Sequence, residues 1–214
     1  MDFDHVVTTT RAVRKRLDLE KPVDPAVIME CIELAIQAPT GSNSQGWRWL
    51  IVTDDDKKKK LADWYRQAWN MAYGGGDAAV AGVPEDRIAQ QKRVLSSADY
   101  LANNLEKVPV HVIPCILGRP GDNSPAAAWA GFMGSIIPAV WSFQLALRSR
   151  GLGSAYTTLH LFHEKEANEL LGIPDTVTQV ALIPVAYTKG TDFKPATRRP
   201  ASEITYWDSW KATR

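Results

Sequence analysis

Apolar positions recur at helical spacing in several parts of the chain. Residues 5–17 predict a short basic helix. Asp24 and Pro25 suit the N-cap and first position of an amphipathic helix that ends near residue 37. Residues 125–150 are the longest helical candidate, capped by Ser124 and kinked at Pro138. This candidate is apolar nearly all round, which predicts burial on every side, in the core or at a subunit interface.

Three β-rich runs predict strands. Residues 47–53 (WRWLIVT) and 178–187 (TQVALIPVAY) are rich in β-branched and aromatic side chains. Residues 108–117 (VPVHVIPCIL) predict another strand, although its prolines argue against a regular central position. Residues 154–161 are expected to be extended and 164–171 to form a short helix. The chain thus carries both predicted strands and predicted helices, and we expect an α/β protein.

The segment 64–107 differs from the rest. Trp64, Trp69 and Tyr73 precede three consecutive glycines, and helical patterns flank this break on both sides. We interpret the segment as a lid-like insertion within one domain that spans residues 1–214. Its aromatic side chains are candidates for stacking on a planar substrate, and helix packing is about as good an explanation for them.

Composition excludes several classes of protein. The net charge of +1 gives no electrostatic support for nucleic-acid binding. Cys31 and Cys115 lie in apolar segments and indicate buried thiols in a reducing compartment. No apolar run approaches 18–20 residues and the N-terminus lacks a signal sequence, so we expect a cytoplasmic protein without a membrane contact.

Arginines provide the first candidate for chemistry. Arg11 and Arg14 share a helix face if residues 5–17 are helical, and they suit phosphate binding, although a solvated basic face is the commoner explanation. Hydrolase and kinase motifs are absent from the sequence. His160 and His163 lie near two glutamates, but a third convincing metal ligand is missing, so we predict no metal.

Several motifs together resemble the nitroreductase family of FMN-dependent oxidoreductases. They are the basic stretch 11–14 (RAVR), the loop 38–48 (APTGSNSQGWR), the helix and exit 144–153 (QLALRSRGLG), the turn 170–174 (LLGIP) and the arginine segment 198–200 (RRP). The loop is the most specific of these, and the motifs occur in the family's order along nearly the whole chain.

The resemblance implies an α+β nitroreductase-like fold, with a central mixed, mostly antiparallel sheet flanked by helices in an intertwined homodimer. It implies FMN as cofactor and NADH or NADPH as electron donor in a ping-pong mechanism. Hydride transfer occurs at flavin N5, so no catalytic side chain is required of the protein. The acceptor would be a nitroaromatic, a quinone or a similar planar molecule.

The same resemblance assigns the site residue by residue. The basic stretch and the C-terminal arginines would hold the FMN phosphate, the 39–43 loop would contact the flavin of the partner subunit, and residues 156–159 would lie along the flavin. The cofactor-binding set is Arg11, Ala12, Val13, Arg14, Pro39, Thr40, Gly41, Ser42, Asn43, Thr157, Thr158, Leu159, Arg198 and Arg199, and the substrate set is Trp64, Trp69 and Tyr73.

Other functions remain open on this scaffold. Reductive dehalogenases and flavin-fragmenting enzymes resemble it in the flavin cradle and differ in the lid. A flavin-binding protein without turnover is the alternative outside the enzymes.

Overall fold

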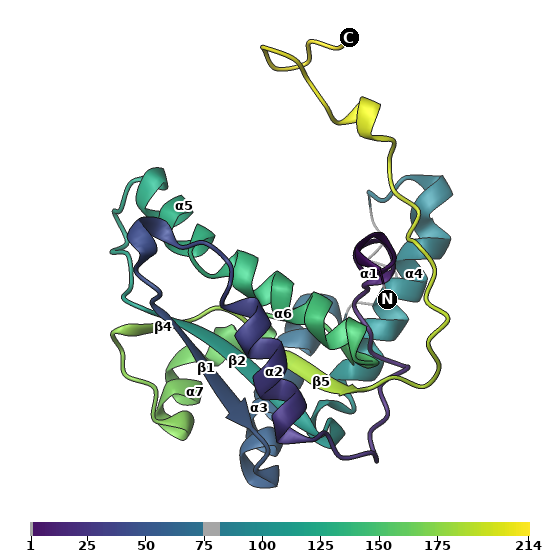
Figure 1. Ribbon diagram of the computed structural model, residues 1–214. Coiled ribbons are helices and arrows are strands. Elements are labelled where there is room, and N and C mark those ends of the chain that lie inside the picture. Colours follow the sequence, from purple (N-terminus) through teal and green to yellow (C-terminus); the bar gives the residue numbers. More distant parts are fainter. Residues whose placement is uncertain (1, 75–81) are drawn as a thin grey trace.

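The structure, a computed structural model, describes residues 2–74 and 82–214 (Figure 1). Its centre is a five-stranded sheet. Four of the strands are hydrogen-bonded in the order β1-β2-β5-β3, and the fifth, β4, pairs with the end of β2 that β5 does not reach. Every pair of strands is antiparallel, and a parallel bridge between Ala12 and Ser154 adds the N-terminal segment to the β3 edge. The strands are β1 (Trp47–Val52), β2 (Val110–Leu117), β3 (Leu152–Ser154), β4 (Val177–Gln179) and β5 (Ile183–Tyr187).

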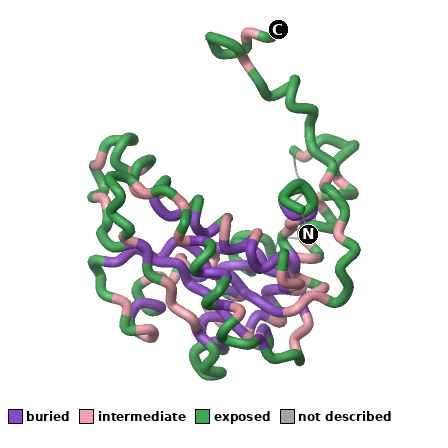
Figure 2. The backbone as a smooth tube through the Cα atoms, viewed as in Figure 1, coloured by how far each residue is buried: buried purple, intermediate pink, exposed green. Residues whose placement is uncertain are grey.

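Helices cover both faces of this sheet, each over its own hydrophobic core (Figures 1 and 2). The helices are α1 (Phe3–Thr9), α2 (Pro25–Ala35), α3 (Asp55–Tyr73), α4 (Glu85–Ala102), α5 (Ala126–Gly134), α6 (Ile137–Ser149) and α7 (Glu164–Leu171), with short 3-10 turns η1 (Gly41–Asn43), η3 (Leu105–Lys107), η4 (Leu159–His163) and η5 (Ala201–Glu203). Side chains of α2 and α6 pack on one face, and those of α3 and α4 pack on the other. The expected α+β architecture, a mostly antiparallel sheet flanked by helices, is confirmed.

Local capping explains the elements that the sequence predicted well. The Asp24 carboxylate accepts a hydrogen bond from the Ala26 N–H at 2.9 Å, and α2 begins at the next residue, Pro25. Asp54 caps α3 in the same way, through the Lys57 N–H at 2.9 Å. Helix α7 ends at Gly172, whose left-handed backbone (φ 68°) favours glycine.

The predicted basic helix over residues 5–17 is wrong. Helix α1 ends at Thr9, and Arg11 to Leu17 run as extended chain and turns. The hydroxyls of Thr8, Thr9 and Thr10 each donate to a carbonyl one turn earlier, at 2.6–2.7 Å. Three consecutive β-branched residues are poor helix formers. The chain then gains more by pairing with the sheet, because Val13 and Leu17 become buried there.

Two long predicted elements are each divided in the structure. The 125–150 helix breaks at Ser135 and Ile136 into α5 and α6, because Pro138 lacks the N–H needed to continue the helix. Pro125, rather than Ser124, occupies the N-cap, without a side-chain bond. The 178–187 strand divides into β4 and β5, which both pair with β2 on either side of its Pro114.

The apolar segment that contains both helices is longer than the sequence pattern suggested. Residues 126–149 include the one described helical stretch that is long and apolar enough to cross a membrane, with a mean hydropathy of 1.4 and 44% of its window buried. The expectation that no apolar run approaches 18–20 residues is therefore wrong. A core helix passes the same test, so this stretch is weak evidence for a membrane contact.

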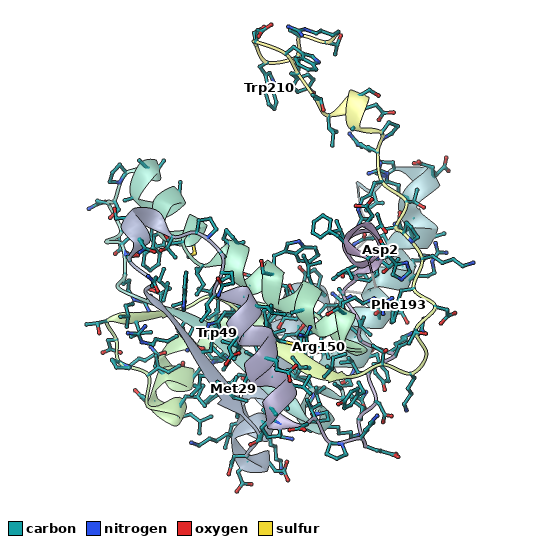
Figure 3. All side chains as sticks on the ribbon, viewed as in Figure 1. Asp2, Met29, Trp49, Arg150, Phe193 and Trp210 are labelled. Atoms are coloured by element: carbon teal, nitrogen blue, oxygen red, sulfur yellow. The ribbon has the colours of Figure 1, made fainter. Side chains whose placement is uncertain are left out.

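The chain after Tyr187 has little regular structure. It passes along α4 and then extends away from the body, so that Trp210 lies far from the sheet and is 81% exposed (Figures 1 and 3). Helices α3 and α4 flank the glycine-rich insertion as expected. Helices α3 and α4 therefore account for most of the predicted lid-like insertion over residues 64–107, and its residues 75–81 lie outside the described residues.

Candidate functional site

The stretch 11–14 lies at the edge of the sheet and is fixed by its backbone. The Val13 N–H donates to the Ser154 carbonyl at 2.8 Å, and the Val13 side chain is buried. In extended chain, neighbouring side chains point to opposite sides, so burial of Val13 leaves its neighbours Ala12 and Arg14 outside the core. Arg11 donates from Nη1 to the Lys194 carbonyl at 2.9 Å, which ties this stretch to the C-terminal segment.

A cavity of about 530 Å³ brings together arginines that are far apart in the sequence. Arg11, Arg14 and Arg198 line it, as the resemblance implied, and Arg93 of α4 joins them. We call it the arginine cavity. Asp and Glu are absent from its lining among residues 2–74 and 82–214, so the four guanidinium groups create a positive potential that suits a phosphate. Its other lining residues are Ala12, Gln90, Val94, Ser97, Pro195, Ala196 and Thr197.

A second cavity of about 260 Å³, which we call the aromatic cavity, shares Arg14 and Val94 with the first. Trp69 and Tyr73 of α3 line it and stack on each other, with ring centroids 4.7 Å apart. Its other lining residues are Tyr65, Gln91, Leu95, Ala98, Tyr156, Thr157, Thr158 and Leu159. Two adjoining cavities, one rich in arginine and one rich in aromatic rings, suit a ligand with a phosphate at one end and a planar ring at the other.

Arg14 is the charged residue that the two cavities share, and part of its side chain lacks a partner among the described residues. Its Nε is buried without a hydrogen-bond partner among the described residues. Burial lowers the pKa of the Arg14 guanidinium. A buried donor without an acceptor is costly, so this position favours an anionic or carbonyl-bearing ligand at the junction.

The segment after β3 is held rigidly beside Arg14. Thr157 and Leu182 exchange backbone hydrogen bonds of 3.2 and 2.8 Å, and the Thr157 hydroxyl donates to the Leu182 carbonyl at 2.6 Å. These bonds fix the start of η4, so Thr158 and Leu159 reach the aromatic cavity from firm structure.

The predicted loop 39–43 lies elsewhere. It packs on α5, where the Gly41 N–H donates to Ser135 Oγ at 3.0 Å. Within and just after it, Ser42, Asn43 and Gln45 all have positive φ, between 48° and 53°, an uncommon backbone for these residues. None of Pro39, Thr40, Gly41, Ser42 and Asn43 lines either cavity of the same chain. A role toward a partner subunit's flavin stays a prediction.

Two further predicted residues lie outside the two cavities. Trp64 stacks on His163, with ring centroids 6.1 Å apart, and packs against the core. Helix packing, the alternative explanation, therefore describes its position. Arg199 lines a neighbouring cavity of about 710 Å³ together with Arg87 and Arg198, and is not in contact with the arginine cavity.

The histidines have structural surroundings. His160 is fully buried with Nε2 3.2 Å from Gln179 Oε1, and burial lowers its pKa to about 4. Within residues 2–74 and 82–214, His, Cys, Asp and Glu side chains form no group of three that could hold a metal ion. Cys31 and Cys115 are buried free thiols, as expected, and burial raises their pKa values to about 11 and 12.

Sequence reasoning missed the contribution of α4. Gln90, Arg93, Val94 and Ser97 all line the arginine cavity and are spaced i, i+3, i+4 and i+7, which places them on one helix face. The spacing is visible in the sequence. The pattern does not show which surface this helix face contacts, because that depends on tertiary packing.

Comparison with known proteins finds a matching family model, a relative in sequence and similar solved structures. A family model described as "Nitroreductase family" matches residues 7–187. The chain is similar to an iodotyrosine deiodinase from Thermotoga neapolitana, with 27% identity over 195 residues that cover 91% of each protein. It is also similar in structure to the FMN and NADPH-dependent nitroreductase NfnB from Sphigopyxis sp. strain HMH (19% identity, TM-score 0.67, 98% of this chain and 100% of that chain). A BluB-like flavoprotein from Clostridium difficile 630 has a TM-score of 0.70 at 17% identity over 98% of this chain and 100% of that one.

Proposed function

The chain belongs to the nitroreductase family, and from that premise we propose that it is an FMN-containing NAD(P)H oxidoreductase. NADH or NADPH would supply electrons, and a nitroaromatic, a quinone or a similar planar molecule would accept them in a ping-pong cycle. The observation that carries the proposal is the convergence of Arg11, Arg14 and Arg198 in a cavity to which the described residues contribute no carboxylate, next to a cavity lined by aromatic rings.

The residues present fit FMN. A phosphate of nearly two negative charges would be neutralised in the arginine cavity by forked hydrogen bonds from Arg11 and Arg198. The unpartnered Arg14 Nε belongs to a residue that lines both cavities, so it would be available to hold the bound cofactor. Bound FMN supplies the redox chemistry, namely acceptance and release of a hydride equivalent.

The protein's own contribution is binding, orientation and exclusion of water. The Thr157–Leu182 bonds hold residues 157–159 in place against one side of the aromatic cavity. Trp69 is itself held by a hydrogen bond of 3.2 Å from its Nε1 to Asp99 Oδ1. Its ring and that of Tyr73 form an apolar wall on which a planar acceptor would stack.

A homodimer is part of the proposal. Helix α5 has the sequence AAAWAGFMG and buries none of its residues in a single chain. Ile137 and Trp141 of α6 are both 44% exposed next to it. Burial of these side chains against a second subunit would remove apolar surface from water, and would bring the 39–43 loop, which packs on α5, to that interface.

An absorbance spectrum of the purified protein tests the proposal directly. We expect a flavin band as purified or after addition of FMN, and its bleaching by NADH or NADPH added in turn under anaerobic conditions. Absence of protein-bound flavin after FMN titration and removal of the free FMN would overturn the proposal. FMN binding without NAD(P)H oxidation would instead support a flavin-binding protein without turnover.

The similarity to an iodotyrosine deiodinase favours one second candidate, reductive dehalogenation. The two activities differ in the acceptor that reoxidises the reduced protein. Anaerobic reoxidation by a nitroaromatic or quinone, but not by a halogenated tyrosine, supports oxidoreduction of planar acceptors. The opposite result, with release of halide, supports the dehalogenase.

A further inference from the structure

The beginning of the C-terminal segment is bound to the N-terminal segment by four polar contacts. Lys189 donates from its backbone N–H to the Arg16 carbonyl at 2.8 Å, and Arg16 Nε donates back to the Lys189 carbonyl at 2.9 Å. Arg16 Nη2 pairs with Asp192 Oδ1 at 2.6 Å. Arg11 Nη1 reaches the Lys194 carbonyl at 2.9 Å. Residues 189–194 are therefore fixed beside the stretch that carries Arg11 and Arg14.

Phe193 belongs to this bound segment (Figure 3). The guanidinium carbon of Arg16 is 4.1 Å from the centroid of its ring, and that of Arg148 is 4.7 Å from the same centroid. Both cations lie over the ring, at distances where cation–π attraction is effective. Phe193 also packs against the hydrophobic core, and it is the only aromatic residue between Tyr187 and Tyr206.

Arg148 is an unusual partner for an aromatic ring because it is only 3% exposed. Its Nη2 donates to the Thr191 carbonyl at 3.2 Å and to Thr9 Oγ1 at 3.4 Å, whereas its Nε and Nη1 have no hydrogen-bond partner. No ion pair is formed by Arg148 within the described chain. The face of the Phe193 ring supplies part of the negative potential that a buried guanidinium otherwise lacks.

The position of this contact along the chain gives it a consequence for the site. Phe193 precedes Arg198 by five residues, and the intervening Pro195, Ala196 and Thr197 line the arginine cavity. Five residues of extended chain span at most about 17 Å. An anchor at Phe193 therefore keeps Arg198 within that distance of the Phe193 ring. Release of the anchor would let Arg198 move away with the rest of the exposed segment.

We propose that Phe193 is a positioning residue, held by Arg16 and Arg148, that keeps Arg198 opposite Arg11 and Arg14 for binding of a phosphate group. The inference rests on the proposed function in that the phosphate is that of FMN. Loss of the anchor should weaken binding of the phosphate and leave binding of the flavin ring and ribityl chain nearly unchanged.

Comparison of FMN with riboflavin isolates the phosphate. We expect Phe193→Leu, which keeps an apolar side chain but removes the ring, to weaken FMN binding to the apoprotein roughly fivefold, the factor expected for the loss of about 1 kcal/mol. Riboflavin affinity should change less than twofold. Phe193→Tyr, which keeps the ring, is the matched control and should bind both ligands as the wild type does. Quenching of flavin fluorescence measures the affinities of the wild type and both variants for the two ligands.

Equal weakening toward FMN and riboflavin, or no weakening in Phe193→Leu, would overturn the inference. If Phe193→Leu fails to fold, Arg16→Gln removes one of the two cations at a partly exposed position and should show the same selective loss. A wild-type protein that binds neither ligand would overturn the proposed function.

Limited proteolysis tests the anchor independently of flavin. Trypsin should cleave after Arg198, which is followed by Arg199, several-fold faster in Phe193→Leu than in the wild type or in Phe193→Tyr. Unchanged cleavage would show that the ring does not hold the segment, and would overturn the inference whatever the flavin affinities are.

Discussion

Gly153 lies so close to Val13 that a Cβ atom on the glycine would be 2.9 Å from Val13 Cβ and 2.8 Å from Thr188 Cγ2. Real Cβ atoms almost never approach other heavy atoms this closely. Three segments meet at this point, namely β3, the stretch that carries Arg11 and Arg14, and the beginning of the segment that leads to Arg198. The glycine therefore sets the distance between the two sources of arginine in the site.

Substitution of Gly153 by alanine should push these segments apart. We expect Gly153→Ala to lower the free energy of unfolding by about 1–3 kcal/mol, the usual cost of overpacking, and to weaken FMN binding. Urea unfolding and fluorescence titration measure the two effects. Gly121→Ala is the matched control, because its new Cβ would meet Ser124 Oγ at an ordinary 3.8 Å. Wild-type stability in Gly153→Ala would contradict the close packing.

Arg14 should show opposite effects on stability and on binding. Its Nε is buried without a partner, and burial lowers the pKa of its guanidinium. Replacement by methionine keeps an apolar side chain of similar length and removes the unpaired charge. We expect the apoprotein of Arg14→Met to be at least as stable as the wild type, by up to about 1 kcal/mol.

The same variant should bind FMN at least about tenfold more weakly, because a charge-assisted hydrogen bond is lost. Thermal unfolding without flavin and a fluorescence titration with FMN measure the two effects. Arg150→Met serves as the control, since Arg150 pairs with Glu30 at 3.3 Å outside both cavities and should not affect FMN affinity. A clear loss of apoprotein stability in Arg14→Met would show that Arg14 is a structural residue.

The elements that could be predicted from the sequence are those determined by neighbouring residues. Asp24 and Pro25 specify the start of α2 within one turn, and the predicted helix 164–171 coincides with α7. The helix predicted over residues 5–17 was wrong because Val13 and Leu17 gain burial by pairing with Ser154 and Thr188, more than 130 residues away. The local sequence pattern cannot show this burial, because it depends on pairing with distant residues.

The site residues also divide into those that the sequence could predict and those that depend on tertiary packing. Motif resemblance supplied Arg11, Arg14 and Arg198, and the structure places all three in one cavity. Arg93 was missed because helix α4 carries polar residues on more than one face, and only packing selects the face that meets the cavity. Phe193 is not among the predicted site residues, because its contact with the buried Arg148 depends on the course of the chain after β5.

Acid should destabilise the protein through two buried histidines. Burial lowers the pKa values of His111 and His160 from 6.5 to about 4. Both rings therefore stay neutral in the folded protein while the unfolded chain binds protons below pH 6.5. Their contribution to stability is complete above pH 6.5 and is lost as the pH falls toward 4, by about 2 kcal/mol per histidine between pH 7 and pH 5.

Urea unfolding at pH 7, 6 and 5 measures this dependence. His160→Gln should reduce the slope of unfolding free energy against pH by about half, whatever its effect on stability at pH 7. His5→Gln, at an exposed position, is the matched control and should keep the wild-type slope. An unchanged slope in His160→Gln would show that the buried ring does not govern acid stability.

Helix α5 should govern the oligomeric state. It is the most apolar helix of the described chain, and it buries none of its residues in one subunit (Figure 2). Trp141, on α6, is 44% exposed on the adjoining surface. A charge at that position would be buried without a partner in a dimer, at a cost of several kcal/mol.

We therefore expect the wild type to be a dimer and Trp141→Asp to be a monomer by light scattering at micromolar concentration. The monomer should also lose FMN affinity if the 39–43 loop, which Ser135 holds against α5, completes the flavin site of the partner. Phe162→Asp is the control, because Phe162 is 71% exposed on η4 and the substitution should leave the dimer intact. A monomeric wild type that binds FMN fully would contradict both the interface and the shared site, since every group needed for the flavin would then lie within one chain.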